Sequence, residues 1–152
     1  MMAAAPADPL LEIENGAIRL LSQREHSRAE LARKLARRFE AGETLQRVLD
    51  ALEERGLLSD RRFTESYVAM RMRKGFGPVR IRAELQERGI DRTLIEPELD
   101  IGRDAWMQHL RQTAAQRFGG VQANGRSEQA KQARFLQYRG FPESLVRDFL
   151  WG

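Results

Sequence analysis

The stretch RMRKGFGPVRIRAELQERGI, residues 71–90, holds a helix break followed by the start of a new helix. Gly75 and Gly77 flank one aromatic residue, and Pro78 restricts its own φ angle and disfavours helical backbone at the residue before it. Proline also suits the first turn of the helix that follows. We therefore predict that one helix ends close to this break and that another begins at Pro78.

Start and stop signals of the same kind recur along the whole chain. Ser27 and Glu30 have the spacing of a capping box, in which each side chain accepts from the other residue's backbone N–H. Gly56 is a candidate left-handed C-cap. Apolar residues between these signals follow helical spacing, and no segment alternates as a strand does. The sequence predicts about nine helices and an all-α fold, with starts at Asp8-Pro9, Ser27, Ser59 or Asp60, Pro78, Asp91, Ser127 and Pro142.

The helix starts at Ser27, Gly77 and Ser127 lie 50 residues apart. A leucine and an arginine three positions after it keep nearly the same frame, as Leu35 and Arg38, Leu85 and Arg88, and Leu136 and Arg139. Recurrence at a fixed period indicates structural repeats. We predict a leader at 1–7 and three tandem three-helix repeats at 8–57, 58–99 and 100–152, forming an elongated, curved body because such repeats pack mainly on their neighbours.

Composition favours a helical protein that meets an anionic partner. Of the 152 residues, 32% are charged and 41% hydrophobic. The net charge is +4 and the isoelectric point is near 10.1, which favours nucleic acid or another acidic partner. The chain has no cysteine and therefore no disulfide. With no signal-peptide pattern at the start and no apolar stretch of membrane-spanning length, we expect a cytoplasmic protein outside the membrane.

Residues suited to catalysis are scarce. His26 and His109 lie in different predicted repeats without metal-ligand spacing, so we expect each to be solvated or to cap a helix. Gly75-Phe76-Gly77 lacks the third glycine of a dinucleotide loop, because Arg80 stands at that position. We therefore expect no enzyme activity, no metal and no cofactor.

The strongest candidate site surrounds the break. Basic side chains converge on it from both helices, no acid lies between residues 71 and 82, and the new helix adds its positive N-terminal dipole. Phe76 lies at the apex, either buried between helices, which we favour, or exposed to stack on a partner. The predicted contact residues are Arg71, Arg73, Lys74, Phe76, Arg80 and Arg82.

A second basic group follows Ser27. Its members are Arg33, Lys34, Arg37 and Arg38. Glu25 and Glu30 lie close in sequence, so two alternatives remain open: surface ion pairs with these acids, or contact with an anionic partner. Elsewhere, Trp106 and Trp151 have helical spacing, and we predict both as core residues.

Three segments resemble the RecX family of regulatory proteins, namely SRAELARKL at 27–35, RRFTESYVAMRMRKGFGPVRIRAELQERGI at 61–90 and ARFLQYRGF at 133–141. The central segment is the most specific of them, because a basic-Lys-Gly-aromatic-Gly-Pro run followed by Arg-Ile-Arg is not a general feature of helix ends and helix starts. Family members often have tyrosine where this chain has Phe76, so the ring is kept and the hydroxyl is lost.

The resemblance implies three tandem three-helix repeats. It also implies a protein, expected as a monomer, that binds the filament of the RecA recombinase on DNA and suppresses filament growth, ATP hydrolysis and strand exchange, and so modulates recombination, DNA repair and the SOS response. Direct contact with single- or double-stranded DNA is left open under this interpretation. The alternative is a basic helical nucleic-acid-binding protein that acts on DNA directly and does not touch the recombinase. The basic residues alone are compatible with both.

Overall fold

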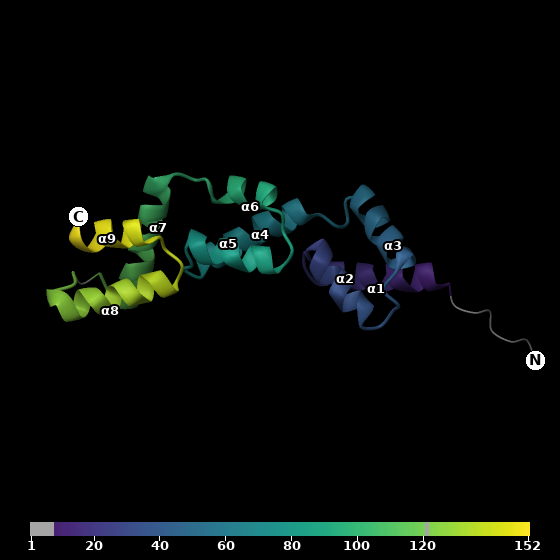
Figure 1. The fold of residues 1–152 in the computed structure, drawn as a ribbon, viewed down its shortest axis with the longest axis horizontal. Coiled ribbons are helices and arrows are strands. Elements are labelled where there is room, and N and C mark those ends of the chain that lie inside the picture. Colours follow the sequence, from purple (N-terminus) through teal and green to yellow (C-terminus); the bar gives the residue numbers. More distant parts are fainter. Residues whose placement is uncertain (1–7, 121) are drawn as a thin grey trace, which may run out of the picture. The chain divides into compact units, whose positions relative to one another are not determined.

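The computed structural model describes residues 8–120 and 122–152, and the predicted leader at 1–7 lies outside them. Within the described chain there are nine α-helices and no strand, as predicted (Figure 1). None of these helices has the length and apolar character needed to span a membrane. The helices are α1 Pro9–Gln23, α2 Arg28–Ala36, α3 Glu43–Glu54, α4 Asp60–Arg73, α5 Pro78–Glu87, α6 Arg92–Leu99, α7 Arg103–Phe118, α8 Gly125–Tyr138 and α9 Glu143–Trp151.

Most helices begin and end where local chemistry predicts. The Asp8 carboxylate accepts from the Leu10 N–H at 3.1 Å, with Pro9 in the first turn. Asp91 accepts from the Thr93 N–H at 2.9 Å. The Ser59 hydroxyl caps α4 through the Arg62 N–H at 3.1 Å. Gly56 has a φ of +73°, which is the predicted left-handed C-cap.

The helix start at Ser27 is confirmed but its capping box is incomplete, and the predicted start at Ser127 is wrong. Ser27 accepts from the Glu30 N–H at 3.1 Å, but the Glu30 carboxylate pairs with Arg24 at 2.6 Å instead of completing the capping box. A charged partner within reach is preferred over a backbone N–H. Ser127 does not open α8, because that helix begins at Gly125 with Asn124 as its N-cap.

The chain forms two compact units, and the first consists of residues 8–64 and 88–90 of the described chain. In this unit α1, α2 and α3 pack against one another around an apolar core. Residues 88–90 join it because the Ser27 hydroxyl donates to the Arg88 carbonyl at 2.9 Å. The core residues are Ile13, Ala17, Leu31, Leu35, Leu45, Val48, Leu49, Leu52 and Leu58.

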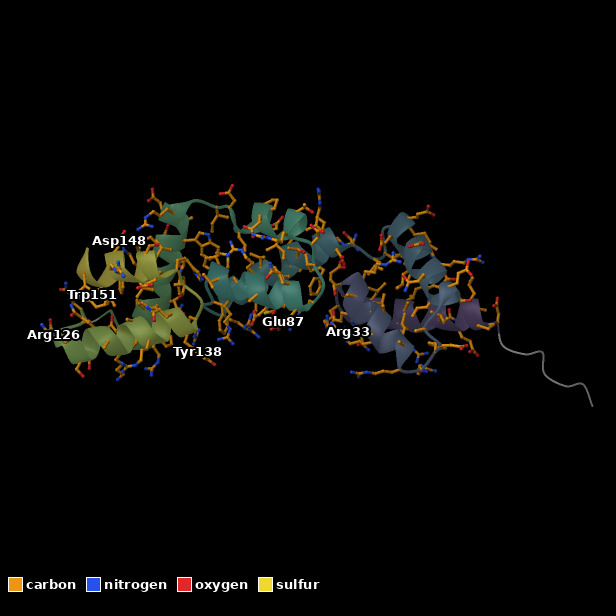
Figure 2. The ribbon with its side chains drawn as sticks, in the orientation of Figure 1. Arg33, Glu87, Arg126, Tyr138, Asp148 and Trp151 are labelled. Carbon is orange, nitrogen blue, oxygen red and sulfur yellow. The ribbon has the colours of Figure 1, made fainter. Side chains whose placement is uncertain are left out.

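The second unit consists of residues 65–87 and 91–152. In it α5 packs on α6, and α7, α8 and α9 pack on one another. Trp106 is a core residue as predicted, with 6% of its surface exposed and its indole N–H donating to the Leu99 carbonyl at 2.8 Å. The core prediction for Trp151 is wrong, because this side chain is 54% exposed. It is the last helical residue of α9 (Figure 2).

Candidate interaction surface

The break between α4 and α5 is built by a helix-terminating motif centred on Gly75. Gly75 has a φ of +84°, and its N–H donates to the Met72 carbonyl at 2.9 Å while the Phe76 N–H donates to the Arg71 carbonyl at 3.1 Å. These two bonds form a Schellman motif, which satisfies the last carbonyls of α4. The motif turns the chain back on itself and brings Phe76 beside Arg71.

The turn between α8 and α9 lies directly against this break. The Gly77 N–H donates to the Arg139 carbonyl at 2.7 Å, and the Val79 N–H donates to the Gly140 carbonyl at 2.9 Å. A Cβ on Gly77 would lie 2.6 Å from the Gly140 oxygen, so the two backbones touch where neither residue has a side chain. Two segments far apart in sequence thereby form one surface.

Three arginines surround the Phe76 ring, which is half-buried. Their guanidinium carbons lie 3.8 Å (Arg71), 4.5 Å (Arg80) and 4.9 Å (Arg139) from the ring centroid. Such stacking stabilises the cations and orders the ring. The Phe76 carbonyl accepts from Nε2 of His109 at 3.0 Å. The predicted alternatives of a buried plug or an exposed stacking ring are therefore resolved as an intermediate: Phe76 is a half-buried ring between cations.

Glu84 neutralises part of the positive charge at the break. Arg71 donates to both of its carboxylate oxygens at 2.8 Å, and the Tyr67 hydroxyl donates at 3.0 Å. Arg80 approaches the same carboxylate at 3.4 Å. Burial by itself would raise the pKa of Glu84, but the hydrogen bonds from Arg71 and Tyr67 outweigh it and hold this pKa below its usual value. Glu84 is therefore a carboxylate at neutral pH.

The predicted residues at the break divide into paired and unpaired cations. Arg82 is paired with Glu96 at 2.6 Å. Arg73 and Lys74 are exposed, and no carboxylate of the described chain pairs with either of them. The lack of a nearby acid in the sequence is thus compensated in space for Arg71, Arg80 and Arg82, while Arg73 and Lys74 remain available to an external anion.

The acids close to the second basic group are occupied by other arginines. Glu25 pairs with Arg62 at 2.7 Å, and Glu30 pairs with Arg24 at 2.6 Å. Among the described residues no carboxylate pairs with the remaining arginines of this group, which are exposed: Arg33 (Figure 2), Arg37 and Arg38. The alternative of local ion pairs with Glu25 and Glu30 therefore does not hold for them.

Lys34, the fourth member of this group, is held by a buried histidine. Its ammonium lies 3.0 Å from Nε2 of His26, whose Nδ1 lies 3.0 Å from the Arg24 carbonyl. Because a carbonyl only accepts, Nδ1 carries the proton and Nε2 accepts from Lys34. His26 is 1% exposed, so the predicted solvated role is wrong for this residue. Burial lowers its pKa, and the charges of Arg24 and Lys34 lower this pKa further.

Two residues that contribute to the break were not among the predicted contacts. Arg139 stacks on Phe76 and donates to the Lys74 carbonyl at 2.8 Å. Tyr138, 71% exposed at the end of α8, has the Arg80 guanidinium 4.9 Å from its ring centroid (Figure 2). The repeat frame that aligns Arg139 with Arg38 and Arg88 was the available signal for the first, and no sequence signal links Tyr138 to the break.

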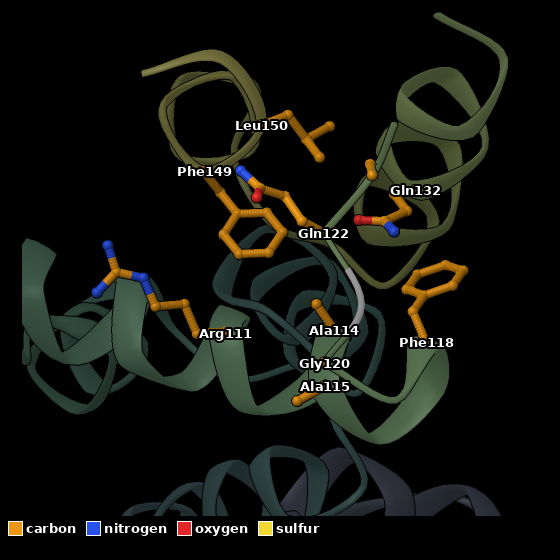
Figure 3. Close-up of a pocket in the computed structure, with 10 residues that line it drawn as sticks. Arg111, Ala114, Ala115, Phe118, Gly120, Gln122, Gln132, Phe149 and Leu150 are labelled. Atoms are coloured by element: carbon orange, nitrogen blue, oxygen red, sulfur yellow. The ribbon is translucent and has the colours of Figure 1, made fainter. Parts of the chain in front are cut away.

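A cleft of about 350 Å³ lies in the second unit, between α7, α8 and α9 (Figure 3). Phe118 and Phe149 lie on its walls, and Arg111 is the one charged side chain among its described lining residues. The Gln132 amide, 4% exposed, points toward this cleft. Its lining is mostly apolar, which distinguishes it from the basic surface at the break and from the second basic group.

Fold and surface together define a class: a helical protein with exposed cations suited to binding an acidic partner. Its described residues include no group of side chains that could hold a metal ion. Models of the first, second and third three-helix domains of RecX match residues 15–52, 59–97 and 105–150. This chain belongs to the RecX family.

Individual relatives agree with this assignment. The chain is 44% identical over 146 residues to the regulatory protein RecX of Ectopseudomonas mendocina, covering 95% of this chain and 97% of the relative. It is 42% identical over 145 residues to that of Pseudomonas fluorescens, covering 95% and 94%. A crystal structure of RecX from Lactobacillus salivarius superposes with a TM-score of 0.80 at 25% identity, covering 95% and 96%.

Proposed function

We propose that this RecX-family regulator binds the RecA filament on DNA and inhibits filament extension, ATP hydrolysis and strand exchange. Through this inhibition it limits recombination, DNA repair and the SOS response. It acts as a monomer in the cytoplasm, by occupying the filament and without a catalytic step. Three repeats, at 8–57, 58–99 and 100–152, supply the contacts.

One observation carries the proposal: each of the two predicted basic groups contains exposed cations that pair with no carboxylate of the described chain. At the α4–α5 break they are Arg73 and Lys74, and after Ser27 they are Arg33, Arg37 and Arg38. An unpaired surface cation is well hydrated and costs little to bring to an acidic surface, whereas an ion-paired one must first lose its partner. The unpaired cations are therefore the better candidates for direct contact with the filament.

Arg71, Arg80 and Arg82 support this contact in a different way. Glu84 holds the guanidinium groups of Arg71 and Arg80 beside the Phe76 ring, and Glu96 holds that of Arg82, so that the break presents a fixed shape. Phe76 and Lys34 complete the proposed contact set. Because the two groups lie in one chain, weak contacts at each combine through a high effective concentration of the second after the first has bound.

The test measures RecA ATP hydrolysis on single-stranded DNA while the protein is titrated at substoichiometric ratios. We expect inhibition well below one copy per RecA protomer. The double reversal Arg73→Glu with Lys74→Glu is expected to raise the concentration needed for half inhibition by about tenfold, because each reversed rim charge adds repulsion to a lost attraction. The same reversal should reduce the salt sensitivity of inhibition.

The matched control is Arg61→Glu with Arg92→Glu. These arginines are also exposed and have no ion pair among the described residues, but they lie outside both basic groups. Equal loss of inhibition in both double variants would show that net charge alone matters. Inhibition that sets in only when bare DNA is saturated would overturn the proposal in favour of direct DNA binding.

A further inference from the structure

The second basic group borders a cleft that its sequence did not indicate. This cleft, about 290 Å³, lies in the first unit between α1 and the end of α2. Gly16, Leu20, Leu35 and Phe39 form its apolar part. Four basic side chains and no acid complete its described lining: Arg19, Lys34, Arg37 and Arg38.

The charge of the cleft is uncompensated. No carboxylate of the described chain pairs with Arg19, Arg37 or Arg38, and Lys34 contacts the buried His26 rather than an acid. Four cations around one concavity repel one another and favour the entry of an anion. The lining therefore selects for a ligand with negative charge at its edge.

The interior of the cleft has a different chemistry from its rim. Phe39 is half-buried, and its N–H donates to the Leu35 carbonyl at 2.8 Å, which positions it directly after α2. The Arg38 guanidinium lies 5.4 Å from the Phe39 ring centroid. An aromatic ring and a guanidinium plane are both surfaces on which a nucleobase stacks.

Gly16 contributes to the depth of the cleft at the expense of helix stability. It lies inside α1, and glycine is the poorest helix former after proline. Packing does not require it, because a Cβ there would meet Leu35 Cδ2 and Phe39 Cε2 at 3.5 Å, an ordinary van der Waals distance. Alanine therefore fits the fold but projects a methyl group toward the Phe39 ring.

We propose that this α1–α2 cleft binds a nucleotide of single-stranded DNA, with an unstacked base on Phe39 and the flanking phosphates on Arg19, Lys34, Arg37 and Arg38. Single-stranded DNA has both features that the cleft would recognise, a free aromatic face and closely spaced phosphates, whereas bases in duplex DNA are stacked on each other. The proposal goes beyond recombinase inhibition, since it concerns DNA in the absence of RecA.

The experiment measures binding of the full chain to fluorescein-labelled oligothymidylate by anisotropy at several salt concentrations. An abasic oligomer with the same number of phosphates is the comparison ligand. We expect the abasic oligomer to bind about tenfold more weakly, because one stacked base is lost. Arg37→Ala is expected to weaken binding and to lower the slope of log affinity against log salt by about 0.7.

Gly16→Ala is the decisive variant, because it is expected to raise the stability of the protein while weakening its binding to DNA. It should raise the thermal midpoint by about 3 °C through helix propensity and weaken oligothymidylate binding severalfold by narrowing the cleft. Phe39→Leu should remove the preference for the oligomer that has bases. Arg61→Ala, which removes an exposed arginine outside the cleft, should leave that preference and the effect of Gly16→Ala unchanged.

Equal binding of the oligothymidylate and abasic oligomers, with no effect of Gly16→Ala, would overturn the proposal and leave a basic surface that binds any polyanion. Equally effective competition by inorganic polyphosphate at matched phosphate concentration would do the same. Tighter binding to anionic phospholipid vesicles than to the oligomer would assign the cleft to a membrane surface instead. RecA inhibition is measured separately, in the titration of ATP hydrolysis described above.

Discussion

Gly140 lies against Arg80 so closely that a Cβ on the glycine would be 2.3 Å from the Arg80 Cβ. The same glycine has a φ of +93° and accepts from the Val79 N–H. This backbone contact, together with that between Gly77 and Arg139, joins the α8–α9 turn to the start of α5. The cations around Phe76 depend on it, because Arg139 and Arg80 come from opposite sides of the joint.

Gly140→Ala should be strongly destabilising. A left-handed non-glycine residue and an overpacked contact each cost free energy, so we expect a loss of roughly 3 kcal/mol in the free energy of unfolding. Urea denaturation followed by tryptophan fluorescence measures it. Gly56→Ala is the matched control, because Gly56 has a similar φ of +73° but nothing within 4 Å of its Cβ position. It should cost about 1 kcal/mol, and equal losses in the two variants would contradict the role of the contact.

Ser27→Ala should cost more than an ordinary cap replacement. The Ser27 hydroxyl is fully buried, accepts from the Glu30 N–H and donates to the Arg88 carbonyl. Losing both bonds should lower the free energy of unfolding by about 2 kcal/mol. Ser59→Ala, which removes a cap bond to Arg62, should cost about 1 kcal/mol. Similar urea midpoints for the two variants would show that the Arg88 bond contributes little.

His26 should make stability depend on pH just below neutrality. Its pKa in the folded protein is lowered from the ordinary 6.5, so the unfolded chain binds a proton more readily than the folded one. The contribution of neutral His26 is present above pH 6.5 and is lost as the pH falls through the folded pKa. His26→Gln should therefore flatten the decline in urea midpoint between about pH 7 and pH 5. An unchanged slope would rule out His26 as its source.

Glu84→Gln should destabilise the second unit at neutral pH. The variant keeps the shape of the side chain but loses the charge that accepts from Arg71 and Tyr67, at an expected cost of about 2 kcal/mol. Because the pKa of Glu84 is lowered in the folded protein, the advantage of the native residue is present above its ordinary pKa of 4.5 and shrinks as the pH falls through the folded value. Urea midpoints at several pH values measure the difference, and a difference that stays constant into acid would contradict the ion pair as its cause.

Helix positions were well predicted because their causes lie within a few residues. Asp8, Ser59 and Asp91 cap the N–H groups two or three positions ahead, and the left-handed backbone at Gly56 depends on the absence of a Cβ in that residue alone. Where a longer-range partner competes, the prediction failed. Glu30 pairs with Arg24 and so does not complete the capping box. The exposure of Trp151 was also missed, because helical spacing alone does not show which side of a helix end is covered.

The candidate surface was predicted less completely, since its charges are balanced across the fold. Arg71 and Glu84 lie on different helices, so the sequence between residues 71 and 82 could not reveal their pairing. Arg139 lies in the turn after α8 and reaches the break by donating to the Lys74 carbonyl. The contact role of the predicted residues stays a prediction that the charge reversals test.

By itself the sequence determined the all-α class, most helix ends and the family, because periodicity, caps and glycine conformation act locally and the family motifs are contiguous. Only the tertiary structure decided which cations keep an acid, how Phe76 is surrounded and that Lys34 rests on a buried His26. The α1–α2 cleft is also a feature that only the tertiary structure decided. Ion pairing, burial and concavity depend on distances between residues that the chain separates, and packing alone sets those distances.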